Sequence, residues 1–298
     1  VTISREKLKQ AESLIEPLSS TSSTSSLPSK LEPRIIESRQ CAEQLTLIDT
    51  KLFFSICADE FIPFSKGKLD QAPNIHRFVN RFNAISFWVV SEITSEPRLA
   101  ERTKLVRAFI TLAEKCCALN NLQTTMGIVV ALNGSAVSRL KKTWSQIPPL
   151  VLKQWEILET ILTPLSNFAN YREFIASKRN FAAIPYTGVS MGDLTFTLDG
   201  NPDFTDDEKT MINWCKWEMA FTNIEKVIQF HQFIPPLTPI PALQNLLTTL
   251  PTVDEKKAYE RSRLIEPKDY EGALVEMFEK QLAMEKEIEL LKKQLATK

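Results

Sequence analysis

The sequence predicts an all-α fold, and three observations point to it. Glycine is scarce, with 7 residues in 298, so few positions call for a sharp turn or a close backbone approach. Hydrophobic residues make up 43% of the chain and charged residues 24%, as in an ordinary globular protein. Between residues 35 and 142 the apolar residues recur three and four positions apart, the period of an amphipathic helix. The length of the chain, 298 residues, predicts one domain of roughly 200–250 residues plus tails.

The first expected elements lie at the N-terminus. Residues 1–18 have the apolar spacing of a short amphipathic helix. The low-complexity run 19–26, SSTSSTSS, predicts a flexible linker. A helix over residues 40–58 follows, with Leu45, Ile48, Leu52, Phe53 and Ile56 as its apolar positions.

The next helix is expected to open at Pro73, with Asn74 as its N-cap. Its apolar stripe runs from Phe78 to Ile93, and Arg81 lies off that stripe. This position suits a charge that faces solvent, so the interpretation from pattern alone is a solvated surface arginine.

Two further helices complete the first half of the chain. One is expected over residues 97–119, and the other begins at Asn121 and ends before Gly134. The second is apolar enough to be buried on all sides. Asn133, beside Gly134, could be a plain C-cap of this helix.

Residues 184–204 differ from the rest of the chain. Gly188, Gly192 and Gly200 all fall within this stretch, between short polar residues and apolar ones. Because glycine lets the backbone turn or another surface approach closely, the pattern indicates a functional element. The segment predicts a helical hairpin with a short arm around 190–198.

The hairpin is expected to turn at Gly200–Asn201–Pro202, with a long arm from residue 204 onward. Acidic residues at 206–208 would lie in the first turn of that arm and complement the helix dipole.

A heptad seam marks the C-terminal segment, which predicts an amphipathic helix. Apolar residues and Gln281 alternate at spacings of three and four from Leu274 to Leu295. This pattern predicts either a homodimer through residues 274–295 or a helix folded back on the domain, and both alternatives remain open.

The composition also excludes several classes of function. Lys+Arg and Asp+Glu are both 36, which gives no support for a nucleic-acid partner. No apolar run has the roughly 18–20 residues of a membrane span, so no transmembrane segment is expected. Five scattered cysteines predict buried thiols in a cytoplasmic protein. His76 and His231 are the only histidines, so neither a metal site nor a Ser-His-Asp relay is expected, and no cofactor.

Several separated blocks resemble one known family. They include CAEQLTLIDTKLFFSI, RFVNRFNAISFWVVSEI, LNNLQTTMGIVVALNGSAVSRLKKTW, IPYTGVSMGDLTFTLDGNPD and the closing IEP at 265–267. In this order they resemble the catalytic domain of Ras-family guanine-nucleotide exchange factors, the RasGEF domain, over about 35–266. Residues 1–34 and 267–298 would then flank this domain as an N-terminal helix with linker and a C-terminal helix.

The resemblance implies a fold and an activity. The fold would be an all-helical bowl with a protruding helical hairpin. The activity would be release of GDP from a Ras-, Rap- or Ral-like GTPase, without bond chemistry and without a cofactor. The hairpin would displace switch I, and the bowl would hold switch II. The protein would be cytoplasmic and recruited to membranes through its GTPase.

The resemblance also assigns residues. Asp199 matches a carboxylate position that stands in for phosphate, and Thr195, four residues earlier on the same helix face, matches a position beside the ion site. Asn201 matches the hairpin-turn asparagine, which either caps the long arm or contacts the GTPase. The remaining contact positions are Arg81, Asn133 and Gly192. The alternative for Asp199 is that it only begins a turn.

Two departures from the family pattern matter. Lys216-Trp217-Glu218-Met219 stands where the family usually carries a basic cluster, which leaves a catalytically silent scaffold as the competing hypothesis. Residues 1–34 are too short for the family's N-terminal exchanger-motif domain. A calcium loop over 199–203 is not expected, because Pro202 interrupts it and the required sixth position lacks glycine.

Overall fold

The computed structural model describes residues 31–232, 234–267 and Met284. In these residues the regular secondary structure is helical, without a β-strand, apart from two isolated bridges. The all-α prediction is therefore confirmed. The expected helix at 1–18 and, apart from Met284, the one at 274–295 lie outside the described residues.

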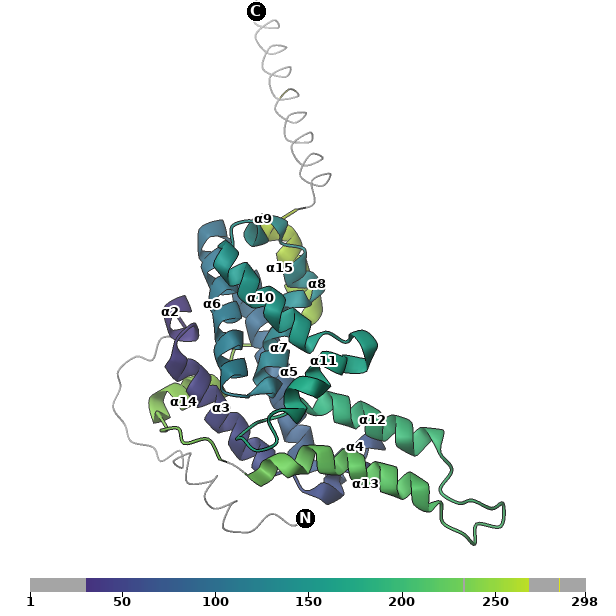
Figure 1. Ribbon diagram of the computed structural model, residues 1–298. Helices are drawn as coiled ribbons and strands as arrows, with labels where there is room; N and C mark the ends of the chain where they lie inside the picture. Colours follow the sequence, from purple (N-terminus) through teal and green to yellow (C-terminus); the bar gives the residue numbers. More distant parts are fainter. Residues whose placement is uncertain (1–30, 233, 268–283, 285–298) are drawn as a thin grey trace, which may run out of the picture.

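The longer helices of the body share one core (Figure 1). They are α3 Arg39–Phe54, α5 Pro73–Thr94, α6 Leu99–Ala118, α7 Leu122–Asn133 and α10 Pro149–Leu162. Helix α7 packs against α5 and α6, while α3 and α10 both pack on α6. Residues 122–129 of α7 are all buried, as predicted, but Val130 and Asn133 are exposed. Helix α7 is thus central, with one accessible edge near its C-terminus.

Shorter elements close the body around this core. They are α2 Pro33–Ile36, η1 Ala58–Glu60, α4 Phe61–Ser65, η2 Leu69–Gln71, α8 Ser135–Ser138, α9 Lys141–Trp144, α11 Leu165–Ala176, η3 Gln229–Gln232, α14 Pro241–Thr248 and α15 Glu255–Ile265. Helix α14 packs on α3, and α15 packs on α5 and α8.

Side chains cap the starts of α3, α7 and α15, whereas the start of α5 differs from the prediction. Asn121, where this helix was predicted to begin, caps α7, because its side chain accepts a hydrogen bond from the Thr124 N–H at 3.1 Å. Asn74 does not cap α5. The buried Glu60 carboxylate accepts from the Asn74 N–H at 2.8 Å and the Ile75 N–H at 3.0 Å instead. Pro73 occupies the first helical position without an N–H, so the next two amides are the ones that need a partner.

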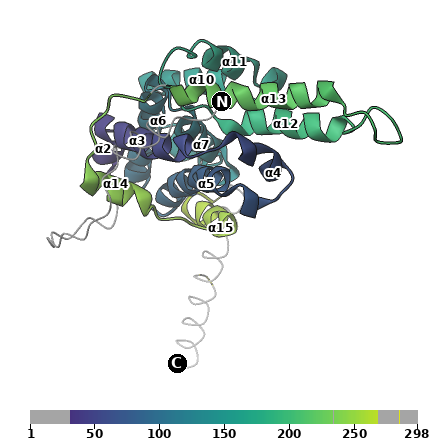
Figure 2. The same ribbon diagram turned by 90° about the horizontal axis from the view of Figure 1, so that it is seen from below.

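The predicted hairpin is present and projects from the body (Figures 1 and 2). Its arms are α12 Thr187–Gly200 and α13 Trp214–Ile228, which pack side by side. The long arm therefore starts at residue 214, and the expectation of a start at 204 is wrong. Asp206 is the reason, because its carboxylate accepts the N–H groups of Thr210 and Met211 and folds residues 206–211 into a loop.

Candidate functional site

The hairpin is anchored to the body through its inner faces. Leu194 and Leu198 of α12 meet Ala220 and Ile224 of α13 in a buried cluster that also holds Phe61 of α4. Helix α12 packs directly on α4. The arms therefore form one rigid unit at their root, while their outer faces and the connecting loop remain exposed.

Polar contacts fix the hairpin further. The Arg172 guanidinium of α11 donates to both oxygens of Asp193, at 2.7 and 2.9 Å, a geometry that also fixes orientation. Between the arms, Asn223 Nδ2 donates to Thr197 Oγ1 at 3.1 Å. These contacts hold α12 against α11 on one side and α13 on the other.

Lys216 joins the two arms at the far end of the hairpin. Its Nζ donates to the carbonyl oxygens of Leu198 and Asn201, both at 2.6 Å, and lies 2.7 Å from Asp203 Oδ1. The lysine is buried. Its hydrogen bond to Asp203 holds the pKa of that carboxyl below its ordinary value. Lys216 thus satisfies carbonyls at the C-terminus of α12, where a cation is favoured.

Sequence reasoning missed this role of Lys216. Lys216 stands where the family usually carries a basic cluster, but its charge is turned inward. No local spacing pattern could reveal this, because the acceptor carbonyl of Leu198 lies 18 residues earlier in the chain.

Thr195 and Asp199 lie one turn apart on α12, as predicted. Thr195 is half-buried, and its hydroxyl donates to the Met191 carbonyl at 3.0 Å. Asp199 is exposed in the last turn of the helix, and in the described part of the chain its carboxylate makes no hydrogen bond or ion pair. The carboxylate therefore has no internal structural task at this position.

Phe196 is a further candidate that sequence reasoning did not single out. It is 80% exposed and lies three residues before Asp199, on the same side of α12. The exposed aromatic ring and the unengaged carboxylate together make this side of α12 a candidate contact surface. The signal was available in the stretch TFTLD, where an aromatic residue interrupts polar ones.

Asn201 has an internal role at the end of the short arm. Its Nδ2 donates to the Thr197 carbonyl at 2.9 Å, so its side chain caps α12. The alternative that Asn201 caps the long arm is wrong, because Asn213 does so by accepting the Lys216 N–H at 3.2 Å.

Gly192 lies on α12 with open space around it. A Cβ atom added there would meet no heavy atom within 4 Å. Packing within the described chain therefore does not require glycine at this position.

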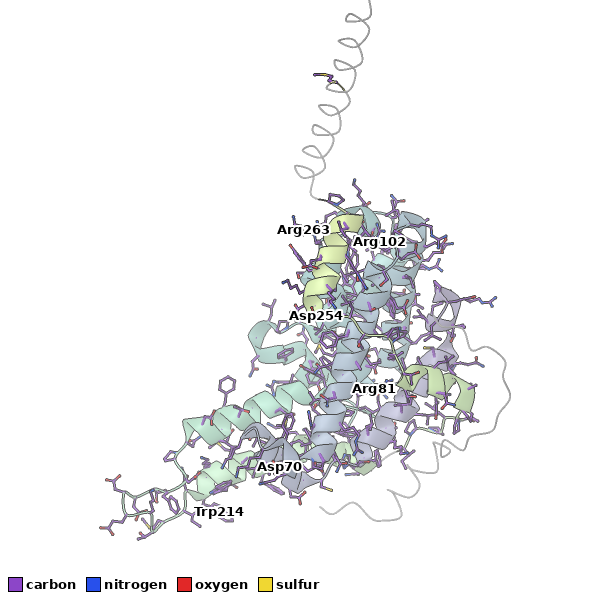
Figure 3. The ribbon with its side chains drawn as sticks, turned by 180° about the vertical axis from the view of Figure 1, so that it is seen from behind. Asp70, Arg81, Arg102, Trp214, Asp254 and Arg263 are labelled. Atoms are coloured by element: carbon purple, nitrogen blue, oxygen red, sulfur yellow. The ribbon has the colours of Figure 1, made fainter. Side chains whose placement is uncertain are left out.

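Arg81 lies in the body, away from the hairpin tip marked by Trp214 (Figure 3). Its side chain is buried, so the interpretation as a solvent-facing charge is wrong. Nη1 donates to the Leu247 carbonyl at 2.6 Å, and Nε donates to the buried Asp49 at 3.4 Å. Arg81 lies on the side of α5 away from its apolar stripe. Helices α3 and α14 supply its two partners there.

Asn133 is exposed at the C-terminal end of α7, one turn after the exposed Val130. Its φ angle is not positive, so it is not a left-handed C-cap. Asp49, the partner of Arg81, binds Asn121 at the other end of α7. Asn133 lies at the C-terminal end of the same helix, whereas Phe82, next to Arg81, approaches Gly127 in the middle of α7.

The described residues contain no group of three His, Cys, Asp or Glu side chains placed to hold a metal ion. Across the same residues, no helix combines the length and the apolar character needed to cross a bilayer.

Comparison with known proteins gives a consistent result. The RasGEF domain family matches residues 40–218, more than half of the chain. Ras guanine nucleotide exchange factors Y and J of Dictyostelium discoideum are 33% and 34% identical to it over 231 and 240 residues. These alignments cover 76% and 79% of this chain, but 15% and 29% of the two relatives.

Cell division control protein 25 of Saccharomyces cerevisiae is 31% identical over 264 residues, 83% of this chain and 16% of that protein. The chain thus spans less than a third of each of these three relatives. The extent of the family match, on an all-helical fold with a projecting hairpin, shows that this chain belongs to the RasGEF domain family.

Proposed function

We propose that this protein accelerates the release of GDP from a Ras-, Rap- or Ral-like small GTPase by inserting its hairpin at the nucleotide site. One observation carries the proposal: α12 is anchored on its inner face, while the Asp199 carboxylate is exposed and unengaged on its outer side. An anchored helix can present a charge at a fixed position without reorganising on binding.

The proposed mechanism is competition for the groups that hold the nucleotide. A GTPase binds phosphate through loop amides and a lysine and binds Mg²⁺ through a hydroxyl. Asp199 would offer a carboxylate to the freed cationic groups. Thr195, which is uncharged, would stand beside the ion site and provide no replacement charge for Mg²⁺. By linkage, a hairpin that weakens nucleotide binding is itself displaced when nucleotide returns.

A second surface on the body would hold the GTPase during this exchange. Asn133 and Val130 of α7 and Phe87 of α5 are exposed, and we assign them to the contact with switch II. Arg81 would support this contact from the body, since its Nη2 has no hydrogen-bond partner in the described residues. Recruitment to a membrane would follow from the location of the GTPase.

The direct test is release of a fluorescent GDP analogue from a panel of Ras, Rap and Ral GTPases. The protein should accelerate release from at least one of them. Thr195→Glu should abolish the acceleration, because a carboxylate beside the ion site would attract the cation that must leave. Glu260→Gln, an exposed change on α15, is the matched control and should exchange like the wild type.

One observation favours a competing function. The single lysine in the stretch 216–219 is buried and bound within the hairpin, so these positions offer no cation to a GTPase. A scaffold that docks a GTPase without opening it would bind its partner with the nucleotide still in place. It would not accelerate GDP release from any GTPase of the panel. Preferential binding to a nucleotide-free GTPase would exclude it.

A further inference from the structure

The outward side of α13 carries a regular stripe. Trp214, Glu218, Phe221 and Glu225 are spaced four, three and four residues apart and therefore share one face of the helix. All four are exposed, Trp214 at 73% and Phe221 at 57%. These four residues are called the aromatic–acidic stripe below. Exposed aromatic rings alternating with charges are typical of a surface that another molecule covers.

Negative charge predominates around the stripe. Residues 199–219 contain six carboxylates, at 199, 203, 206, 207, 208 and 218, and two lysines, at 209 and 216. Lys216 is buried and paired with Asp203, so Lys209 is the one exposed cation of this stretch. The nearest further cation on α13 is Lys226, at the root of the hairpin, where it donates to Asn223. Lys66, which follows α4, also acts on Asp203, but six carboxylates against these few lysines still leave the tip with an excess of negative charge.

We propose that the aromatic–acidic stripe selects a GTPase whose surface beside the nucleotide site is basic and apolar, and discriminates against one that is acidic there. This inference rests on the proposed function and names its partner class. Like charges brought together at an interface oppose binding, whereas complementary charges speed association. Arginine and lysine side chains on the partner would match both the carboxylates and the aromatic rings of the stripe. Their cationic groups form ion pairs with carboxylates and cation–π interactions with aromatic rings.

The test measures association of the full chain with each nucleotide-free GTPase of the panel by stopped-flow. For the preferred GTPase, the association rate constant should fall as NaCl rises from about 25 to 400 mM, since salt screens attraction between opposite charges. Glu218→Lys should lower this rate constant by about threefold or more at low salt. Phe221→Ala should instead accelerate dissociation, because it removes buried apolar contact.

Glu260→Lys is the control for the charge change. It introduces the same charge on α15, at the opposite end of the molecule from Trp214 (Figure 3), and should leave association unchanged. Circular dichroism checks that each variant is folded.

The outcomes separate this inference from the proposed function. If GDP release is accelerated but Glu218→Lys associates as fast as the wild type or faster, the charge preference is wrong and the exchange function stands. Faster association at high salt would overturn it in the same way. If no GTPase binds, both fail. If Phe221→Ala binds the GTPase like the wild type but loses binding to another protein, the stripe has a different partner and the inference is wrong.

Discussion

Asp199 is exposed at the end of a helix whose other side is buried, so its charge is available to a partner without cost to the fold. Asp199→Asn should reduce GDP release by about tenfold or more, since a hydrogen bond to a charged group contributes about 1.5–3 kcal/mol and tenfold corresponds to about 1.4 kcal/mol. The free energy of unfolding should change by less than about 0.5 kcal/mol. Nucleotide-release kinetics and urea denaturation measure the two effects. Wild-type exchange by this variant would refute the carboxylate's role.

Gly192 is a position where a substitution should raise stability but slow GDP release. Alanine fits the open space at this position and favours a helix over glycine by about 0.5–1 kcal/mol. Gly192→Ala should therefore raise the free energy of unfolding by roughly this amount. If a GTPase approaches α12 closely at Gly192, the same variant should slow GDP release. A variant that is more stable and exchanges normally would remove Gly192 from the contact surface.

His231 lies buried between aromatic rings at the root of the hairpin, 4.4 Å from the Phe53 ring and 5.2 Å from the Phe54 ring. Burial lowers the pKa of His231 from 6.5 to about 4. The His231 imidazole is therefore protonated near pH 6.5 in the unfolded chain but only near pH 4 in the folded chain. Stability should fall as pH decreases through this window, by about 3 kcal/mol.

His231→Phe removes this titration. Urea denaturation of both proteins between pH 7.5 and about 4 should show a smaller loss of stability for the variant. Parallel pH curves would contradict the assignment.

At the scale of elements, the hairpin depends on Lys216 to hold its two arms in register. Lys216→Met keeps the length of the side chain but leaves the carbonyls of Leu198 and Asn201 without their donor. Each unsatisfied buried acceptor costs about 1–3 kcal/mol. With two acceptors affected, the variant should lose roughly 2–6 kcal/mol of stability and should exchange more slowly at saturating GTPase. Lys209→Met, in the exposed loop, is the control for charge and should change neither.

Helix periodicity predicts the body of this fold well and its connections poorly. Helices α3, α6 and α7 begin and end within a few residues of the expected positions. Helices α3 and α6 have apolar residues at helical spacing, α7 is a nearly continuous apolar run, and each has a clear boundary. The start of α13 was wrong by ten residues. The acidic run at 206–208 suits a helix start, but Asp206 binds backbone amides within the loop, and Asn213 supplies the actual cap.

The candidate site divides in the same way. Thr195 and Asp199 could be placed on one helix face, because their spacing is a local property. The burial of Arg81 could not, since its partners Asp49 and Leu247 lie 32 and 166 residues away. A charged residue outside the apolar stripe of its helix is exposed only if no other helix covers it. The periodicity of one helix does not show whether another helix packs there.

At the scale of the whole molecule, Glu266 ties the end of the described chain to its middle. Its carboxylate accepts from the Thr143 N–H and Arg102 Nη2, both at 3.0 Å, and from the Lys142 N–H at 3.0 Å. Arg102 is buried and also donates to Thr143 Oγ1 at 2.8 Å. Helices α6, α9 and the segment after α15 thus meet at one carboxylate, near the Arg102 and Arg263 labels of Figure 3.

Burial alone would raise the pKa of Glu266, but the hydrogen bonds from Thr143 and Arg102 outweigh it, and the pKa lies below the ordinary 4.5. A depressed pKa stabilises the fold above the unfolded-state value and loses that contribution as pH falls through the folded-state value. Glu266→Gln should therefore lower the free energy of unfolding at pH 7 by about 1.5–3 kcal/mol, with the deficit shrinking below about pH 4.5.

Urea denaturation of the wild type and the Glu266→Gln variant across this pH range measures the difference directly. Glu255→Gln, an exposed change on α15, should give a curve that overlays the wild type. Because the Glu266 carboxylate bonds to Arg102, Lys142 and Thr143 of the body, the variant should still accelerate GDP release like the wild type at temperatures where it is folded. A deficit that persists unchanged at acidic pH would mean that Glu266 acts through packing rather than through its charge.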